Sequence, residues 1–484
     1  MSAGETLLIR NAMVLTLNER DEIHERSDIL IRDGTIEAIG LLPPQTLQDA
    51  TRIIDASGML AAPGLVNAHM HSQSGTMAGF GDRLSHPAFM WLTQAHTSRR
   101  TPDEIRLSVL LCAAQMLQTG TTAAIDHFPG QRFSLADMDA VMSAWAETGM
   151  RVTLGMRFFD GEFGDIIPSA ADLAPELAAA ARAVDILKPH PLPALKEQMP
   201  EVVRRWHGHA GRLGVFPAPS NPDRCSDEAL MFCAQLAETH NLGIHTHLLE
   251  TRAQADIAAK RYAATTVAHL GSLGILSDRW SCAHSIWLTD ADIELMARHQ
   301  SIAVHNPESN ARIGSGRMRT PEMLAAGVPI ALGTDGSGAN DNLVMHEAMR
   351  AAATLHRADL PDCGDWISAR DAMRMATMGG AKAMRLERMI GRIAPGYRAD
   401  ICLYRLDMPV WTPVNDPVSQ LVFAETGASV AYTVVDGDIL VDKGRVTAFD
   451  AEGALAEISG MMASIAKRNS DLFAVADTIA KAIP

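Results

Sequence analysis

Between residues 62 and 393 the chain alternates short apolar segments with amphipathic helical segments, and this alternation restricts the possible fold more than any other feature. Eight of the apolar segments have the length and composition of strands. Eight consecutive strand–helix units over ~250–400 residues predict an α/β fold, a parallel (β/α)8 barrel of the TIM type. The predicted strands are Gly64–Ala68, Thr121–Asp126, Arg151–Met156, Arg212–Ala218, Gly243–His247, Ser281–His284, Ser301–His305 and Val328–Thr334.

The segments between these strands have the apolar spacing of surface helices. In a barrel of this kind the chemistry lies at the carboxyl ends of the strands. We therefore look for functional residues just after each predicted strand. Examples of the predicted helices are Pro102–Thr119, Leu135–Thr148, Ser226–His240, Thr289–Arg298 and Pro321–Ala326.

The two ends of the chain have a different pattern, of short strands joined by tight turns. Asp33-Gly34 separates two strand-like segments near one end, and Asp436-Gly437 does the same near the other. An Asp-Gly pair flanked by alternating apolar residues is a hairpin signal. Both ends therefore indicate β-structure.

Either end alone would leave unpaired strand edges, which proteins avoid. We therefore expect residues 1–62 and 394–450 to build one composite β-sandwich, with the barrel domain, 63–393, inserted between them. The alternative is two unrelated β segments. Residues 451–484 are expected to form a helical tail that packs on the outside.

Charge and cysteine content exclude several functional classes. The net charge of −15 comes without any long Lys/Arg block, so we expect no nucleic-acid partner. The six cysteines are widely spaced and include no Cys-x-x-Cys pair, which is typical of reduced thiols in a cytoplasmic protein.

The first residues do not have the pattern of a signal peptide, and no apolar run reaches the ~18–20 residues of a membrane span. We expect a cytoplasmic protein with no membrane partner.

Two histidines, His69 and His71, follow the first predicted strand after an apolar run and a Pro-Gly pair. Side chains at positions i and i+2 of a strand lie on the same face, so both imidazoles can point at one site. Two converging neutral imidazoles suit a divalent transition metal. An isolated His-x-His pair is more often one structural and one surface histidine, so the interpretation depends on residues further along the chain.

Polar residues also end the fifth and sixth predicted strands. His245 and His247 share a face, and Glu250 follows where the loop turns over the barrel mouth. We assign His247 as a metal ligand and Glu250 as the acid/base group beside it. His245 either orients a ligand through a hydrogen bond or is a core histidine with satisfied hydrogen bonds. His284 ends the sixth strand in the same register, which favours a role at the attacking water over that of a lone buried histidine.

The seventh and eighth predicted strands end in sharp turns. Asn-Pro and Ser-Asn pairs break the chain within 305–310, so His305 and Asn310 are candidates for a pocket wall, with a purely structural turn as the alternative. Asp335 lies in the glycine-rich segment 333–341, which lacks both common phosphate-loop patterns. Glycines beside Asp335 let the backbone approach closely while its carboxylate points inward, which suits a metal ligand or a general base.

Together these residues indicate a catalytic metal site. A catalytic zinc ion needs about three protein ligands and an open position for water, whose pKa the metal lowers toward roughly 7. A carboxylate must then take and return protons. Several polar residues in one register, at the ends of strands one, five, six and eight, are hard to explain as coincidence. They are His69, His71, His247, Glu250, His284 and Asp335.

With these residues in place, the sequence resembles the amidohydrolase superfamily. Within it, the chain is similar to the aminohydrolase/chlorohydrolase-like branch of nucleobase, adenosine-type and triazine deaminases and hydrolases. The similarity runs nearly from end to end. The matching segments are Pro63–His71, Gly120–Thr122 with Asp126, His247–Glu250, Ala283–His284, His305–Pro307 with Ser309 and Asn310, Gly333–Gly336, Gly379–Ala381, Pro395–Gly396 and Ala399–Asp400.

The resemblance implies one divalent metal ion, zinc with iron(II) as the alternative. It implies that Glu250 protonates a ring nitrogen of a bound heterocycle and that His284 helps to position the attacking water. Asp335 would accept the water's proton and pass it to departing ammonia. No lysine that could bridge two metals stands at the fourth strand end, 216–220, so a single-metal site is favoured. The implied metal ligands are His69, His71, His247 and Asp335.

The leading functional hypothesis is therefore a metal-dependent hydrolytic deaminase. Its substrate would be an amino-substituted N-heterocycle of the purine, pterin, pyrimidine or triazine type, attacked at an amidine-like carbon with release of ammonia. One alternative is a hydrolase of the same branch that releases chloride, an alkylamine or an acyl group. The other is a non-catalytic homologue that binds a ligand. The resemblance also implies a homo-oligomer, a dimer or larger.

The sequence departs from the branch where substrate specificity is set. Ser220 stands where the adenosine-type deaminases usually have a histidine, and Trp91-Leu92 is not followed by their Pro-Glu pair. Ser74 stands where guanine deaminases usually have a glutamine. Neither specificity carries over. For the candidate substrate contacts, packing or surface exposure is at least as good an explanation; they are Gln73, Trp91, His96, Arg157, Phe158, His305 and Asn310.

Overall fold

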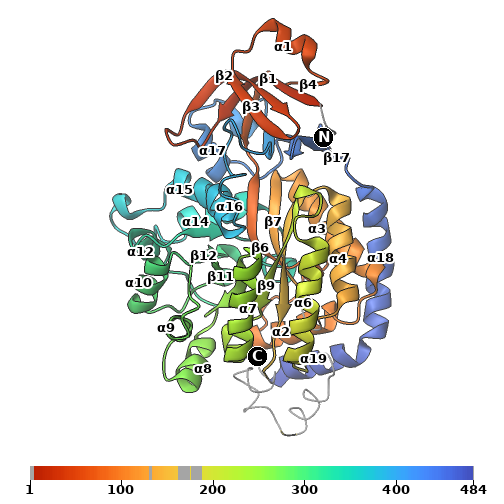
Figure 1. Cartoon of the computed structure of the whole chain (residues 1–484), viewed down its shortest axis with the longest axis vertical. Coiled ribbons are helices and arrows are strands. Elements are labelled where there is room, and N and C mark those ends of the chain that lie inside the picture. The colour runs from red at the N-terminus through yellow and green to blue at the C-terminus, as the bar shows by residue number, and fades with distance from the viewer. Residues whose placement is uncertain (1–4, 130–132, 162–174, 176–187, 483–484) are drawn as a thin grey trace.

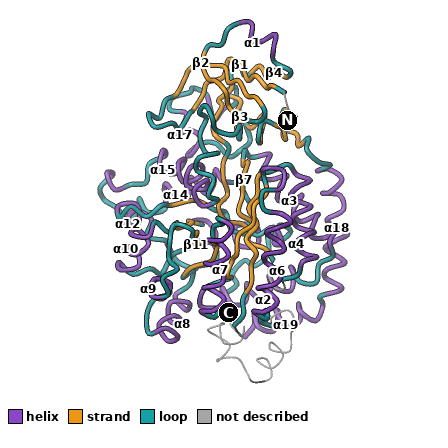
Figure 2. Tube along the Cα trace, viewed as in Figure 1, coloured by secondary structure: helices purple, strands orange, loops and turns teal. Residues whose placement is uncertain are grey.

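The chain forms a barrel of parallel strands with a mixed sheet at one end. The structure, a computed structural model, describes residues 5–129, 133–161, 175 and 188–482. Figure 1 shows the mixed sheet at the top, built from both ends of the chain, and the barrel below it. Figure 2 shows the barrel strands at the centre with helices around them. The predicted α/β barrel inserted between two β-rich chain ends is confirmed.

Eight parallel strands form the barrel in two hydrogen-bonded sheets, ordered β6-β7-β8-β9 and β10-β11-β12-β13. Two backbone hydrogen bonds link the sheets: His247 N donates to Ser220 O at 3.2 Å, and Asp335 N donates to His69 O at 2.9 Å. All eight predicted strands are confirmed. They are β6 Leu65–Met70, β7 Thr121–Phe128, β8 Arg151–Phe158, β9 Leu213–Pro219, β10 Ile244–Leu248, β11 Trp280–His284, β12 Ile302–His305 and β13 Ile330–Leu332.

Helices cover the outside of the barrel, and their ends carry the expected caps. Thr101 accepts from Glu104 N while the Glu104 side chain accepts from Thr101 N, a capping box that begins α3. Gly149, at φ 69°, ends α4 in the left-handed conformation that glycine adopts without strain. The helices are α2 His86–Thr97, α3 Pro102–Gln118, α4 Leu135–Thr148, α6 Leu192–Trp206, α7 Asp227–His240, α8 Arg252–Tyr262, α9 Thr266–Ser272, α10 Asp290–His299, α11 Pro307–Arg312, α12 Thr320–Ala325, α13 Ser337–Asn340, α14 Met345–Thr354, α15 Ala369–Arg374 and α16 Gly380–Ala383.

The two chain ends meet in one mixed nine-stranded sheet, in which β5 pairs with β14 in antiparallel orientation. Both predicted hairpin turns are confirmed, since Asp33-Gly34 joins β2 to β3 and Asp436-Gly437 joins β15 to β16. Both residues of each turn have positive φ, as a tight hairpin requires. The elements are β1 Thr6–Leu15, β2 Ile23–Arg32, β3 Thr35–Gly40, α1 Pro44–Asp49, β4 Arg52–Asp55, β5 Met59–Pro63, β14 Ile401–Arg405, α17 Pro417–Phe423, β15 Val430–Val435, β16 Asp438–Asp442 and β17 Arg445–Val446.

A buried ion pair joins the barrel to this sheet. Arg151, at the start of β8, donates to both carboxylate oxygens of Asp400 at 2.8 and 3.0 Å. It also donates to Asp436 at 3.2 Å. The side chains of Arg151 and Asp400 are each 1% exposed. Removing one partner of such a pair would leave a buried charge unpaired, so the contact fixes how the two parts meet.

The residues after 450 form two helices, α18 Ala451–Arg468 and α19 Ser470–Ala482, separated at Asn469. The Asn469 side chain donates to Ala95 O at 2.8 Å and to Ser98 O at 2.9 Å, at the end of α2. Helix α18 lies along the outside of the barrel and α19 packs on α2 (Figure 1). The tail therefore supports a helix that forms one wall of the pocket. No helix in the described part of the chain has both the length and the apolar character to cross a bilayer.

Candidate active site and metal centre

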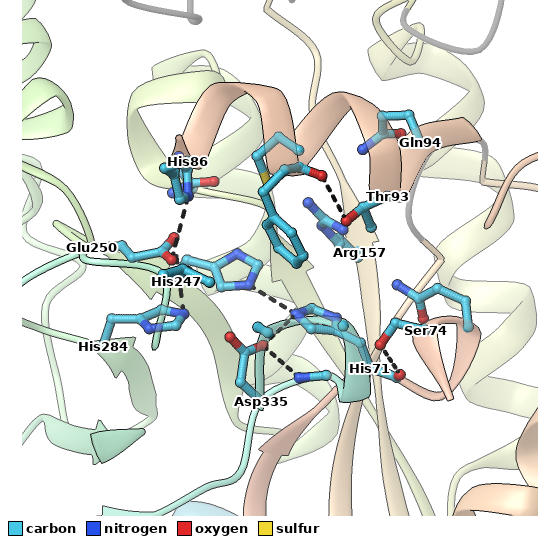
Figure 3. Close-up of a pocket in the computed structure, with 18 of the residues that line it drawn as sticks. His71, Ser74, His86, Thr93, Gln94, Arg157, His247, Glu250, His284 and Asp335 are labelled. Carbon is cyan, nitrogen blue, oxygen red and sulfur yellow. Dashed lines mark hydrogen bonds and ion pairs between the residues drawn. The ribbon is translucent and has the colours of Figure 1, made fainter. Parts of the chain in front are cut away.

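The predicted metal ligands come together at the carboxyl ends of β6, β10 and β13. Asp335 Oδ1 lies 3.3 Å from His71 Nε2 and 3.5 Å from His69 Nε2. His247 Nε2 lies 3.2 Å from His71 Nε2. Figure 3 shows His71, His247 and Asp335 pointing toward one another. Residues far apart in the sequence thus present their ligand atoms to a single small space.

Backbone carbonyls hold two of the imidazoles in one tautomer. His71 Nδ1 donates to His127 O at 2.8 Å, and His247 Nδ1 donates to Ser220 O at 2.6 Å. In a neutral ring this leaves Nε2 unprotonated, with its lone pair free to bind a metal. Burial lowers the pKa of His247 well below its usual range, so this ring stays neutral. Hydrogen bonds of this kind orient the histidine ligands of metal sites.

His69 is held through a second histidine. Its Nδ1 lies 2.8 Å from His245 Nε2, and His245 Nδ1 lies 2.5 Å from Ser281 Oγ. The fully buried His69 Nε2 has no hydrogen-bond partner among the described residues. Burial lowers the pKa of His69 to about 4, so the ring is neutral near pH 7. A buried nitrogen without a partner is costly, and a cation would satisfy it. Three imidazole nitrogens and one carboxylate are a fitting donor set for a divalent zinc ion.

Asp335 has a second set of partners that fix its carboxylate. Ser309 Oγ donates to Oδ2 at 2.6 Å, and Gly336 N donates to Oδ1 at 2.8 Å. Burial acts to raise the pKa of Asp335, but His69 and His71 outweigh it and hold the pKa well below its usual range. The carboxylate is therefore ionised and oriented toward the imidazoles.

Close packing explains the glycines beside Asp335. A Cβ on Gly333 would lie 2.9 Å from the backbone nitrogen of His69, and one on Gly336 would lie 2.2 Å from Ser74 Oγ. Asp335 itself has φ 62° and His284 has φ 71°, in the left-handed region. Such backbone costs about 1–3 kcal/mol per residue and is concentrated at functional sites. The surrounding structure thus holds both functional side chains in conformations that they would not adopt alone.

Glu250 lies between two histidines above the metal ligands (Figure 3). Its Oε2 is 4.0 Å from His284 Nε2, and its Oε1 is 3.4 Å from His86 Nε2. Burial acts to raise the pKa of Glu250, but His284 and His86 outweigh it and hold the pKa at about 2. His284 Nδ1 lies 2.8 Å from Asn310 Oδ1 and donates to it, so Nε2 faces Glu250. An ionised carboxylate and an oriented imidazole above the ligands can accept and return a proton.

A pocket opens above these groups, and two of the candidate substrate contacts line it. They are Gln73, after β6, and Arg157, at the end of β8. The Arg157 guanidinium donates to Ser220 Oγ at 3.1 and 3.2 Å. Burial lowers the pKa of Arg157 to about 9. The opposite wall is one face of α2, which presents His86, Phe89, Met90, Thr93 and Gln94.

Trp91 and His96, the other candidates on this segment, do not line the pocket. Trp91 and Ala95, four residues apart, share the face of α2 that packs on α19, and His96 lies in the last turn of the helix. Trp91 packs in a cluster with Leu472 and other residues of α19. The His96 ring contacts Phe80 and Phe473, with centroids 4.2 and 4.8 Å away. Their position favours packing over substrate contact.

Three further candidates are also placed outside the pocket lining. His305 is buried at the end of β12, with its ring 6.4 Å from that of His356. Asn310 is buried and holds His284 through the hydrogen bond described above. Phe158 is buried in the main hydrophobic core. Asn310 therefore acts on the site through His284.

Some site residues were not anticipated. His127 lies with His69, His71 and His247 in one group, its ring stacked on His71 at 5.6 Å. The second predicted strand stopped at Asp126, whereas β7 continues to Phe128 and carries His127 to the site. A longer strand prediction would have included it.

His86 and Arg224 also line the pocket without having been predicted. Pro87 is the second residue of α2, so the preference of proline for the first helical turn could have indicated where the helix begins. It would not have shown which face of the helix points at Glu250. Arg224 is the last residue of a short helical turn, Pro222–Arg224, after β9, and no sequence pattern marks it.

Comparison with known proteins shows which family the chain resembles. The model of the Amidohydrolase family matches residues 60–440. A 5-methylthioadenosine/S-adenosylhomocysteine deaminase of Nitratidesulfovibrio vulgaris is 33% identical over 461 residues, 93% of this chain and 96% of the relative. A 5'-deoxyadenosine deaminase of Methanosarcina mazei is 31% identical over 460 residues, again 93% of this chain and 96% of the relative.

The fold is also similar to that of a solved structure. An atrazine chlorohydrolase from Arthrobacter aurescens TC1, complexed with zinc, superposes with a TM-score of 0.83 at 26% identity. The match covers 94% of this chain and 100% of that chain. The barrel and the sheet of both chain ends are therefore shared with a zinc-binding protein.

Proposed function

The chain belongs to the amidohydrolase family, and on that premise we propose that it is a metal-dependent deaminase of adenine nucleosides and their 5'-substituted relatives. The observation that carries the proposal is the convergence of the predicted ligands beneath Glu250 and His284. Relatives at 31–33% identity over nearly the whole chain support the substrate class.

The chain's own residues divide the chemistry between them. His69, His71 and His247 through Nε2, and Asp335 through Oδ1, would hold one divalent ion. That ion, when bound, supplies a water that is acidic near neutral pH. Asp335 takes the proton of the attacking water, and His284 orients that water. Glu250 delivers a proton to the ring nitrogen next to the carbon under attack, which makes that carbon more electrophilic.

The pocket offers different surroundings to the two parts of such a substrate. Phe89, Met90 and Ile313 provide apolar contact for a flat ring. Arg157 and Arg224 provide donors for the part of the molecule that does not react. The reacting edge of the ring would then face Glu250.

The second candidate is a hydrolase that releases chloride or an alkylamine from a triazine. Similarity to the atrazine chlorohydrolase favours it, at 26% identity and a TM-score of 0.83. The same metal ligands and the same acid, Glu250, would serve either leaving group. The groups at the bottom of the pocket therefore do not distinguish a nucleoside deaminase from a triazine hydrolase. The side chains on the walls of the pocket must determine which substrate binds.

An ammonia-release screen tests the proposal. The zinc-loaded protein is assayed with adenosine, 5'-methylthioadenosine, 5'-deoxyadenosine and S-adenosylhomocysteine, and with pterins, pyrimidines and amino- and chlorotriazines. Ammonia from the nucleosides, absent with Glu250→Gln, is the expected result. Chloride or amine from triazines without ammonia from any nucleoside would favour the second candidate. Turnover of none of them would contradict both.

The metal and the assembly state belong to the same proposal. Zinc is favoured by the donor set and by the zinc in the similar chlorohydrolase structure. Family resemblance favours a homo-oligomer, and the widely spaced cysteines favour a cytoplasmic location. Elemental analysis of the purified protein and light scattering test the first two points directly.

A further inference from the structure

The C–N bond to the amino group breaks and a C–O bond to the oxygen of water forms, which yields the oxo-heterocycle and ammonia. The two protons of the water balance this hydrolysis, since the ring nitrogen keeps one and the ammonia takes the other. When the nitrogen leaves as ammonium, the turnover takes up one further proton from solvent. The groups beside the metal ligands are nearly inaccessible, with His284 1%, Asp335 8% and Glu250 10% exposed. A proton therefore needs a route from solvent to these groups.

His86 has the right position for that route. It is the first residue of α2, and its Nε2 lies 3.4 Å from Glu250 Oε1. Its side chain is 18% exposed, more than those of Glu250 and His284. Figure 3 shows His86 on the opposite side of Glu250 from His284. One carboxylate oxygen of Glu250 thus faces His284, beside the metal ligands. The other faces His86, which is partly exposed to solvent.

The other hydrogen-bond partners of Glu250 cannot carry a proton from solvent to its carboxylate. Ser315 Oγ lies 3.4 Å from Glu250 Oε1, but Ser315 is buried and a hydroxyl does not hold an extra proton near pH 7. Glu250 N donates to Gln254 Oε1 at 2.6 Å, and a carboxamide does not titrate. Histidine alone has an ordinary pKa near neutrality. The other charged or titratable groups that line the pocket are His71, Arg157, Arg224, His247, His284 and Asp335.

We propose that His86 positions Glu250 and relays protons between solvent and its carboxylate. Glu250 protonates the ring nitrogen, Asp335 passes one proton of the water to the amino group, and the proton left on the new C–O oxygen goes to the same nitrogen, which departs as ammonium. His86 then gives its proton to Glu250 and takes another from solvent. This inference rests on the proposed function, because a relay is needed only where Glu250 transfers protons. His86 acts through Glu250 and is a positioning residue for it.

The first test is kinetic and uses whichever compound the zinc-loaded parent deaminates. With His86→Ala we expect kcat to fall roughly 10–100-fold, while KM changes less than about threefold and metal content is unchanged. Added imidazole should restore part of kcat, and the rate should rise with buffer concentration, unlike that of the parent. A structural role would not produce this rescue. Parental kcat in His86→Ala, or a loss confined to KM, would overturn the proposal.

A matched control uses another histidine–carboxylate pair. His269 Nε2 lies 2.8 Å from Asp227 Oδ1, away from the pocket. His269→Gln should keep parental kcat and show no response to imidazole. An equal loss in His269→Gln would mean that removing any such pair lowers the rate, which would also overturn the proposal.

The second test needs no turnover and separates failure of the relay from failure of the proposed function. The His86 ring signal is assigned by its loss in His86→Ala and is recorded by NMR at one fixed pH in the parent and in Glu250→Gln. Because Glu250 Oε1 lies 3.4 Å from His86 Nε2, replacing the carboxylate should change the chemical shifts of the His86 ring. Identical ring shifts would show that the pair does not exist in solution, whatever the substrate screen finds.

Discussion

The bottom and the wall of the pocket are built in different ways. At the bottom, each ligand has a second partner on the scaffold. The partners are His245 for His69, His127 O for His71, Ser220 O for His247 and Ser309 for Asp335. The wall formed by α2 has few such contacts and depends on α19, which packs on its far side. The residues that perform the reaction are therefore fixed by the ends of the barrel strands. The residues that contact the substrate lie in part on a helix that α19 supports. Substitutions should therefore lower activity most at the bottom of the pocket and least at residues of α2 that do not line it.

The largest effect is expected for His69→Ala. This variant removes one ligand of the site and leaves His245 Nε2 without its partner. Metal content should fall below stoichiometric, and activity should fall by more than the ~10–100-fold typical of a lost supporting partner. Elemental analysis after gel filtration measures the metal. Retention of a full equivalent would remove His69 from the ligand set.

Glu250→Gln should separate metal binding from proton transfer. The variant keeps the shape of the side chain but cannot carry a proton. We expect full metal content and a kcat lower by about 10²–10⁴-fold, the usual range for a lost general acid. Parallel zinc analysis and steady-state kinetics test this. Parental turnover would mean that another group protonates the ring.

Asn310→Ala tests a residue that supports the bottom of the pocket indirectly, through His284. Its Oδ1 accepts from His284 Nδ1, and without it the His284 ring can rotate or change tautomer. A loss of about 10–100-fold in kcat with unchanged metal content is expected. If kcat stays at the parental value, the orientation of His284 does not limit the reaction.

Asn469→Ala tests the wall. Its side chain donates to Ala95 O and Ser98 O, so the variant leaves two buried carbonyls unpaired at the end of α2. We expect KM to rise about 2–10-fold, with kcat and metal content near those of the parent, and the free energy of unfolding to fall by roughly 1–3 kcal/mol. A loss of metal instead would show that the bottom depends on α19 as well.

The smallest effect on activity is expected for His96→Gln, in the last turn of α2, where the ring packs between Phe80 and Phe473 and does not line the pocket. Burial lowers the pKa of His96 to about 4 from an ordinary 6.5. Between these values the unfolded chain holds a proton that the folded chain does not, so stability falls as the pH falls from 6.5 toward 4, by at most about 1.4 kcal/mol per pH unit. The variant should keep kcat and KM within about twofold and lose that part of the slope. Denaturation at several pH values measures it, and an unchanged slope would contradict the neutral buried ring.

The same contrast explains what could be predicted from the sequence. Strand residues alternate between faces, and parallel strands in a barrel end at one edge. These two rules sufficed to bring His69, His247 and Asp335 together without any long-range information. His127 was not predicted, because the predicted strand ended one residue before it.

The wall could not be predicted in this way. Which face of α2 points inward depends on α19, almost four hundred residues further along the chain. Trp91 and His96 have the residue types of pocket walls, yet they pack outward, while His86 faces Glu250. No pattern within residues 86–97 predicts which face of α2 lines the pocket.

Anomalous diffraction at the zinc edge, from crystals grown with one equivalent of zinc, tests the central claim most directly. We expect one peak, about 2.0–2.2 Å from Nε2 of His69, His71 and His247 and from Asp335 Oδ1. A peak elsewhere, or no peak among these four atoms at full zinc occupancy of the protein, would contradict the account.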